Sequence, residues 1–277
     1  MISSFPFKNS KLNIPLSIVN YINNAGIRRP FACYIGLKFQ FSGKVHKTTL
    51  FDKSTRWTMG IKDKRSFNAY IDKLVKHQFL VFNPKSGYYF FRSFDRLRTI
   101  IKAKDRASII LYCEDFSKIN SLIDTALIGQ VIRNQEYFWV KGKKNFRRAA
   151  FTMKDNANTL VKVDETKKPP YFGLSNFTIA KYLNCSLSQA CKRKHKAEQL
   201  GLLLTKKHFK LYTTLSKADY NIREQIYRTS PTLGNRLRFT VWSDPITGKK
   251  GVSLVQQLHD EITPLTQFSK RKRILLK

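Results

Sequence analysis

The clearest pattern of apolar and polar positions begins at Asp63 and predicts a helix followed by a β-hairpin. Apolar residues recur there at i, i+4, i+7 and i+8, which places them on one face of a helix. These residues are Phe67, Ile71, Leu74 and Val75. Two apolar runs, at residues 79–82 and 88–91, then flank a stretch of Asn, Pro, Lys, Ser and Gly that is typical of a turn between two strands.

A second segment, shifted by 123 residues, shows the same order of elements. Ala190 falls on Phe67 and Ala197 on Leu74, and Ser186 is a good N-cap for the second helix. The sequence predicts a short amphipathic helix before it, over residues 177–183, and a hairpin after it that turns near residues 206–208. Residues 57–94 are called the first repeat here, and residues 177–214 the second repeat.

The order of short helix, tight turn, longer basic helix and hairpin resembles that of winged helix-turn-helix DNA-binding proteins. The match is closest over residues 179–186 and 199–203, and it is looser in the first repeat, where Gln78 stands in place of the glycine before the wing. The resemblance implies an α+β, mainly helical fold of two winged-helix domains, each a three-helix core with a β-hairpin wing, plus a basic C-terminal extension. The tandem architecture and size resemble those of phage and plasmid replication initiators.

In these families the second helix of the pair enters the major groove, and the wing contacts phosphates or the minor groove. Arg suits guanine, and Asn or Gln suits adenine, in direct base contacts. The first repeat would then present Lys62, Lys64, Arg65, Asn68 and, in its wing, Lys85. The second would present Ser188, Gln189, Lys192, Arg193, Lys196 and, in its wing, Lys206 and Lys207. The alternative is that these residues are only the solvent-facing side of packed helices.

The pattern also predicts how the chain is divided. An N-terminal arm (1–27) precedes the first winged-helix domain (28–105), whose opening helix lies at 30–39; the second domain (106–215) opens with a helix at 117–132 and holds a basic insertion at about 136–175. The C-terminal extension (216–277) is predicted to contain a helix at 216–229, a strand at 237–241, a turn at 244–248, a short helix at 252–262 and a basic tail.

The charge of the chain indicates the kind of partner that it binds. The chain has 52 Lys and Arg residues against 18 Asp and Glu residues, for a net charge of +34, and its 42% hydrophobic content is enough for a folded core. The basic residues are clustered, which favours a polyanion as the partner over an evenly solvated surface. We expect that polyanion to be double-stranded DNA.

The sequence does not read as a secreted or membrane protein. The first 26 residues lack the pattern of a secretory signal, and the longest apolar helical stretch, residues 119–132, is too short and too polar to span a bilayer. The four cysteines form no C-x-x-C pair, which suits reduced thiols. We therefore expect a cytoplasmic protein, nucleoid-associated or in a host cytoplasm, with no membrane partner.

Motifs for catalysis are not evident. Gly43-Lys44 and Gly248-Lys249 lack the earlier glycine of a phosphate-binding loop, and the five histidines are far apart. We expect no enzyme activity, no metal and no cofactor, with a metal-dependent nuclease built from scattered carboxylates as the minority alternative. Aromatic residues beside basic runs leave single-stranded DNA or RNA as a further minority partner, although most of these rings should be core.

These observations lead to a sequence-specific double-stranded DNA-binding protein, with a replication initiator that binds an origin as the first choice. A transcriptional regulator is close behind, and a non-specific coating or packaging protein carried in a virion is the third alternative. A homodimer or a partner from the replication machinery is compatible with each.

Overall fold

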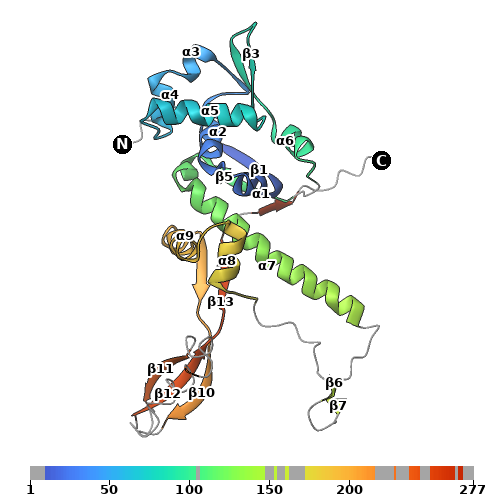
Figure 1. The fold of residues 1–277 in the computed structure, drawn as a ribbon, viewed down its shortest axis with the longest axis vertical. Coiled ribbons are helices and arrows are strands. Elements are labelled where there is room, and N and C mark those ends of the chain that lie inside the picture. Colours follow the sequence, from blue (N-terminus) through green and yellow to red (C-terminus); the bar gives the residue numbers. More distant parts are fainter. Residues whose placement is uncertain are drawn as a thin grey trace. The chain divides into compact units, whose positions relative to one another are not determined.

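The structure, a computed structural model, is α+β, with helices and small antiparallel sheets (Figure 1). It describes residues 10–103, 107–146, 153–154, 160–161, 172–215, 228, 237–243, 250–265 and 268–270. The chain divides into two compact units. Unit 1 comprises residues 1–131, 179–203 and 264–277, and unit 2 comprises residues 132–178 and 204–263.

Unit 1 contains most of the helices. Its elements are β1 (Lys11–Pro15), α1 (Leu16–Asn24), α2 (Arg28–Gln40), β2 (Lys44–His46), α3 (Lys47–Leu50), α4 (Lys53–Thr58), α5 (Lys64–Lys76), β3 (Leu80–Asn83), β4 (Tyr88–Phe91), α6 (Phe94–Ile100), β5 (Ala107–Tyr112), the 3-10 helix η1 (Cys113–Lys118), α9 (Leu187–Gln199) and β14 (Phe268–Lys270). Four elements cross the boundary between the units: α7 (Ile119–Phe146), α8 (Asn176–Leu183), β9 (Leu203–Lys206) and β13 (Asp260–Pro264). Unit 2 adds β6 (Met153–Lys154), β7 (Leu160–Val161), β8 (Gly173–Leu174), β10 (Phe209–Leu215), β11 (Leu237–Ser243) and β12 (Lys250–Gln257).

An aromatic cluster forms the core beneath the first repeat. The rings of Phe31 and Tyr34 on α2 lie 5.8 and 5.2 Å from the ring of Phe79, and all three side chains are fully buried. The hydroxyl of Tyr34 donates a hydrogen bond to the carbonyl of Arg92 at 2.6 Å, so the one polar atom of this residue is satisfied. Burial raises the pKa of the neighbouring Cys33 thiol to about 12, as expected for a small core residue.

The prediction of an N-terminal arm is wrong for residues 10–27, which are the part of it that the structure describes. Strand β1 pairs antiparallel with β5 in a sheet of order β1-β5-β14, and α1 buries Leu16, Ile18, Val19 and Ile22. Their burial makes this segment part of the core of unit 1, because an arm would leave these apolar side chains in water.

The helix and hairpin predicted for the first repeat are confirmed. Helix α5 buries Phe67, Ile71 and Leu74, whereas Val75 is 37% exposed and the prediction that it faces the core is wrong. Strands β3 and β4 pair across the turn at residues 84–87, and β2 joins them in a sheet of order β2-β4-β3.

The second repeat departs from its predicted hairpin. Helices α8 and α9 form as predicted, and β9 follows α9, but β10 pairs with β12 in a sheet of order β10-β12-β11. The strand beside β9 is instead β13, in a sheet of order β8-β13-β9. Helix α9 also belongs to the same unit as residues 1–131, so residues 106–215 do not form a separate unit as predicted.

Two further segments differ from prediction. Helix α7 runs for 28 residues, through the start of the predicted insertion at 136–175. Residues 252–262 were predicted to form a helix, but they belong to β12 and β13. Strand β12 pairs with β10 and β11, and β13 pairs with β8. The predicted strand at 237–241 is confirmed as β11.

Several predictions fall outside the described residues: the helix at 216–229 apart from Arg228, the turn at 244–248, most of the insertion and the tail after Lys270. Among the described helices, none has the length and hydropathy needed to cross a bilayer.

Candidate nucleic-acid interface

The two repeats match residue by residue at the start of their longer helices. Asp63 caps α5 by accepting hydrogen bonds from the amides of Arg65 and Ser66, at 3.2 and 2.8 Å. Ser186, 123 residues later, caps α9 by accepting from the amide of Gln189 at 3.3 Å. Hydrogen bonds from Ser66 and Arg65 also lower the pKa of Asp63. Both helices have 13 residues and begin directly after their cap.

The match continues at the ends of these helices. The residue in the left-handed conformation is Gln78 in the first repeat, with φ 61°, and Gly201 in the second, with φ 68°. The amide of Gln78 donates to the carbonyl of Val75 and that of Phe79 to the carbonyl of Leu74. The equivalent bonds run from Gly201 to Glu198 and from Leu202 to Ala197, again with the shift of 123 residues. Each helix therefore ends in the same turn, and each turn leads into a four-residue strand.

The tight turns before these helices are related but differ in length. In the first repeat Gly60 has φ 72° and its amide donates to the carbonyl of Trp57. In the second Asn184 has φ 50° and its amide donates to the carbonyl of Lys181. The first turn holds one residue more before its N-cap, which accounts for its looser match in sequence.

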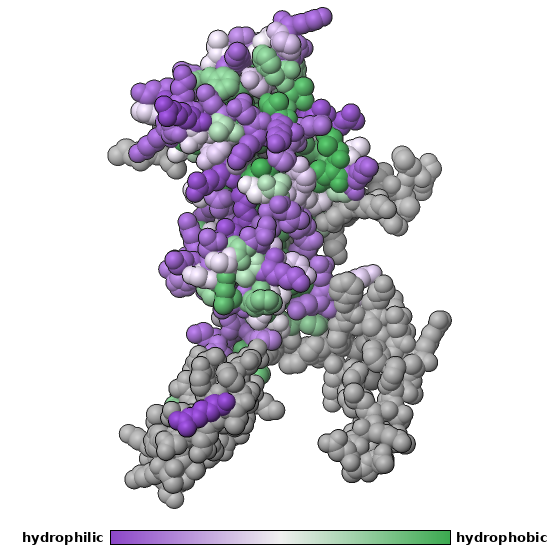
Figure 2. All heavy atoms as spheres, viewed as in Figure 1, coloured by the Kyte–Doolittle hydropathy of each residue, from purple (hydrophilic) through white to green (hydrophobic). Residues whose placement is uncertain are grey.

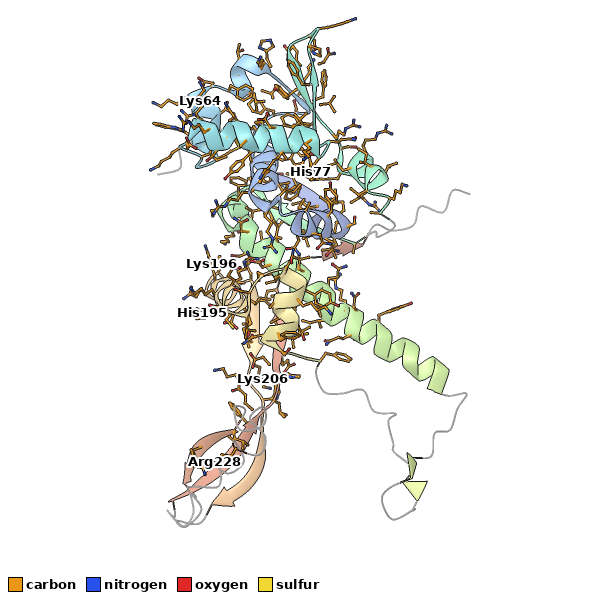
Figure 3. All side chains as sticks on the ribbon, in the orientation of Figure 1. Lys64, His77, His195, Lys196, Lys206 and Arg228 are labelled. Carbon is orange, nitrogen blue, oxygen red and sulfur yellow. The ribbon has the colours of Figure 1, made fainter. Side chains whose placement is uncertain are left out.

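An exposed stripe runs along one side of each longer helix. On α5 it consists of Arg65, Ala69, Asp72, Lys73 and Lys76, and on α9 of the matching residues Ser188, Lys192, His195, Lys196 and Gln199. Figure 3 shows His195 and Lys196 projecting from the side of α9 that faces away from α7, and Lys64 at the opposite end of α5 from His77. The stripe of α9 holds no acidic residue, whereas that of α5 holds Asp72.

Most of the predicted DNA-contacting residues are exposed. Those with exposed side chains are Lys62, Lys64, Arg65, Lys85, Ser188, Gln189, Lys192, Lys196, Lys206 and Lys207. Four of them lie in or beside α5 and its hairpin, four lie on α9, Lys206 is the last residue of β9, and Lys207 follows it. Exposure leaves these side chains able to reach a ligand.

Asn68 and Arg193 differ from the prediction. Asn68 is half-buried, and its Oδ1 atom is enclosed without a hydrogen-bond partner, so the amide cannot present both of its groups to an adenine edge. Arg193 is turned toward the protein, with Nη1 enclosed and 3.8 Å from Oδ1 of Asp124. Its partner Asp124 lies on α7, with a side chain only 5% exposed.

Asp124 is the centre of an ionic network that joins α7 to α2 and α9. Arg28, the first residue of α2, donates from Nη1 to Oδ1 of the same carboxylate and from Nε to Oδ1 of Asn23 at 3.0 Å. Asn23 in turn donates from Nδ2 to the carbonyl of Tyr182 on α8 at 3.0 Å. Burial raises the pKa of Asp124, and the two arginines partly offset that rise. Arg193 is therefore a positioning residue for α9 and not a free cation.

The hairpin of the first repeat is held beside its turn by backbone and ring contacts. The amide of Lys47 donates to the carbonyl of Gly87 at 2.9 Å, and the His46 ring lies against the Tyr88 ring, with 5.1 Å between centroids. Gly87 has φ 70°, and a Cβ atom there would lie 2.8 Å from Nε2 of His46. The positive φ favours glycine at this position, and any larger residue would also have to displace the His46 ring. The turn thus keeps a fixed shape and leaves Lys85 exposed at its tip.

Sequence reasoning missed Lys73 and Lys76, which lie on the exposed stripe of α5. The signal was present, because Lys73 occupies the position that matches Lys196 when the shift of 123 residues is applied. Among the residues that the structure describes, no three His, Cys, Asp or Glu side chains come together as metal ligands would.

No family model matches the sequence, and the searches of curated proteins and of solved structures found no match either.

Proposed function

We propose that the chain is a non-enzymatic protein that binds double-stranded DNA sequence-specifically through α5 and α9, as the recognition helices of two winged-helix modules. The observation that carries this proposal is the agreement of the two repeats in N-cap, helix length, left-handed turn and following strand. In both repeats these elements leave a stripe of the longer helix exposed. A helix of this kind fits the major groove, which is about 12 Å wide.

The chemistry of the stripes suits a duplex. Lys192 and Lys196 are one helical turn apart on α9, where they would neutralise neighbouring phosphates, while Ser188 and Gln189 lie in its first turn, where recognition helices contact base edges. On α5 the corresponding early residues are Lys64 and Arg65. Release of condensed counterions would make this binding strongly dependent on salt.

A salt titration with the full chain tests the proposal. If roughly 6–10 phosphates are neutralised, affinity for duplex DNA falls about 10³–10⁵-fold between roughly 50 and 200 mM salt. The double variant Lys192→Ala/Lys196→Ala should reduce the slope of log affinity against log salt by about two units. The matched control is Lys11→Ala/Lys102→Ala, which removes the same charge from two exposed residues that belong to neither stripe. An equal loss in the control, or almost no salt dependence in the wild type, contradicts the proposal.

Within this function we propose origin binding by a replication initiator, because two recognition helices in one chain suit a composite site. Transcriptional regulation is the second candidate, favoured by the same helices. Selection of bound fragments from genomic DNA separates them: one origin-like array supports the initiator, many promoters support the regulator, and no consensus supports a coating or packaging protein.

A further inference from the structure

The sheet of the first repeat has a second face on which two large apolar side chains are exposed. Leu80, Tyr89 and Phe91 are buried on its inner face, along with Val45 of β2. The alternate residues point to the other side, as strand geometry requires. Of these, Val81 is 37% exposed and Phe90 39% exposed, and Figure 2 shows hydrophobic surface over the β3–β4 hairpin at the top of the view.

The register places these residues in two rows. Phe90 on the central strand lies opposite Lys44 of β2 and Val81 of β3, and Tyr88 lies opposite His46 and Asn83. Residues two apart on a strand are about 6.8 Å apart, and neighbouring strands about 4.8 Å. The outer face therefore offers the Phe90 ring in the middle of an open row, with the Tyr88 ring in the next row.

Positive charge surrounds the rings. The Nζ atom of Lys44 lies 5.2 Å from the centre of the Tyr88 ring, and Lys85 is exposed at the tip of the hairpin. The three strands and their turn contain no acidic residue. A ligand for this face should thus combine flat apolar groups with negative charge.

We propose that the outer face of the β2-β4-β3 sheet binds single-stranded nucleic acid, with an unpaired base stacked on Phe90 and the backbone phosphates near Lys44 and Lys85. Every base has a face that can stack on an aromatic ring, and the neighbouring phosphates supply the charge. A protein partner fits less well, because lysine is depleted in protein interfaces and this small face is bordered by two lysines. The site shares Lys85 with the predicted duplex contacts but is separate from the stripes of α5 and α9, so the stacking of a base on Phe90 does not depend on the duplex function proposed above.

The test measures binding of the full chain to a fluorescent thymidine oligonucleotide and, in parallel, to a duplex. Phe90→Ala should weaken single-strand binding by about fivefold or more, since stacking contributes about 1–3 kcal/mol per base. Phe90→Trp should restore it, and duplex affinity should stay unchanged. Lys44→Ala should lower the salt dependence of single-strand binding by about one unit.

Phe209→Ala serves as the matched control, because Phe209 is also an exposed aromatic residue, 51% exposed, on β10. Thermal unfolding of Phe90→Ala shows whether the sheet is intact. The proposal is overturned if the wild type does not bind the oligonucleotide, if Phe90→Ala and Phe209→Ala behave alike, or if Phe90→Ala weakens single-strand and duplex binding equally. Light scattering that shows a wild-type dimer and a monomeric Phe90→Ala variant overturns it too, in favour of self-association.

Discussion

The first and second repeats have the same local backbone but different support from the rest of the chain. Helix α5 packs with Phe67, Ile71 and Leu74, whereas the matching positions of α9 are Ala190, Lys194 and Ala197. Large apolar side chains hold the first helix, while small residues and the Arg193–Asp124 ion pair hold the second. The same helix and cap can therefore be fixed to a protein by two different kinds of contact.

The comparison of the two helices also shows a structural role for an arginine that was predicted to contact DNA. Arg193 and Tyr70 occupy equivalent positions, and both are half-buried, so the arginine that was predicted to contact a base holds the helix in place. The two stripes have the same net charge of +2, because Asp72 offsets one of the three cations Arg65, Lys73 and Lys76 on α5, while α9 has Lys192 and Lys196 and no acid. We therefore expect α5 and α9 to contribute about equally to the salt-dependent affinity for DNA.

Removal of Asp124 should have the largest effect on stability. Asp124→Leu leaves Arg28 and Arg193 without their shared carboxylate, and loss of one partner of a buried pair costs about 3–5 kcal/mol. Urea unfolding measures the change in the free energy of unfolding. Asp115→Leu is the control, because the Asp115–Lys118 pair is half-exposed and should contribute less than about 1 kcal/mol. A variant as stable as the wild type would show that the network does not hold α9.

The second-largest effect on stability is expected when core residues are exchanged between the two repeats. Leu74→Ala should cost about 2–5 kcal/mol by leaving a cavity under α5. At the matching position, Ala197→Leu should cost about 1–3 kcal/mol, because the fully buried Ala197 leaves no room for a larger side chain. Thermal unfolding of both variants tests this. A neutral Ala197→Leu would mean that α9 is loosely packed and that the contrast between the repeats is wrong.

Substitutions at the left-handed residues of the two turns should change the stability of the chain in opposite directions. Gln78→Gly should stabilise the chain by about 1 kcal/mol, because glycine adopts φ 61° without the strain that a side chain brings. Gly201→Ala should destabilise it by about 1 kcal/mol through backbone strain alone, since a Cβ there meets nothing within 4 Å. Equal effects of the same sign in chemical denaturation would contradict the equivalence of the two turns.

The smallest expected effect is a pH dependence confined to the first repeat. Nδ1 of His77 lies 2.7 Å from the Tyr21 hydroxyl, and burial, with help from Lys76 and Lys73, lowers the pKa of His77 below 6.5. The unfolded chain then binds the proton more readily, so this contribution to stability is present above about pH 6.5 and is lost as the pH falls below it. His77→Leu, which places there the residue of the second repeat, should show a smaller loss of stability between about pH 7.5 and 5.5. If the wild type and His77→Leu lost the same amount of stability over this pH range, His77 would not be the cause of the pH dependence.

Local signals explain what could be predicted from the sequence. Ser186, Gly201 and the Asn83–Gly87 turn act within a few residues of themselves, so their positions define helix ends and the first hairpin directly. The candidate interface followed from these signals, because exposure of Lys192 and Lys196 is set by the helix period.

Long-range pairing explains what could not be predicted. Nothing near β9 indicates that its neighbour is β13, and nothing near Arg193 indicates that α7 brings Asp124 beside it. The region of β12 and β13 has apolar residues at spacings that fit a short helix as well as strands, and only its partners decide. The apolar spacing of α1 was readable in the sequence, but it lies in the segment that was predicted to be an N-terminal arm.

The distance along the chain between paired strands sets an order for folding. Four residues separate β3 from β4, whereas 53 residues separate β9 from β13. By the entropy of loop closure alone, the second pairing costs about 2 kcal/mol more, and hairpins with short turns close in microseconds. During synthesis on a ribosome, the β3–β4 pair can form soon after its own residues have emerged. The sheet that contains β9, next to α9 in the sequence, cannot be complete until β13 has been synthesised.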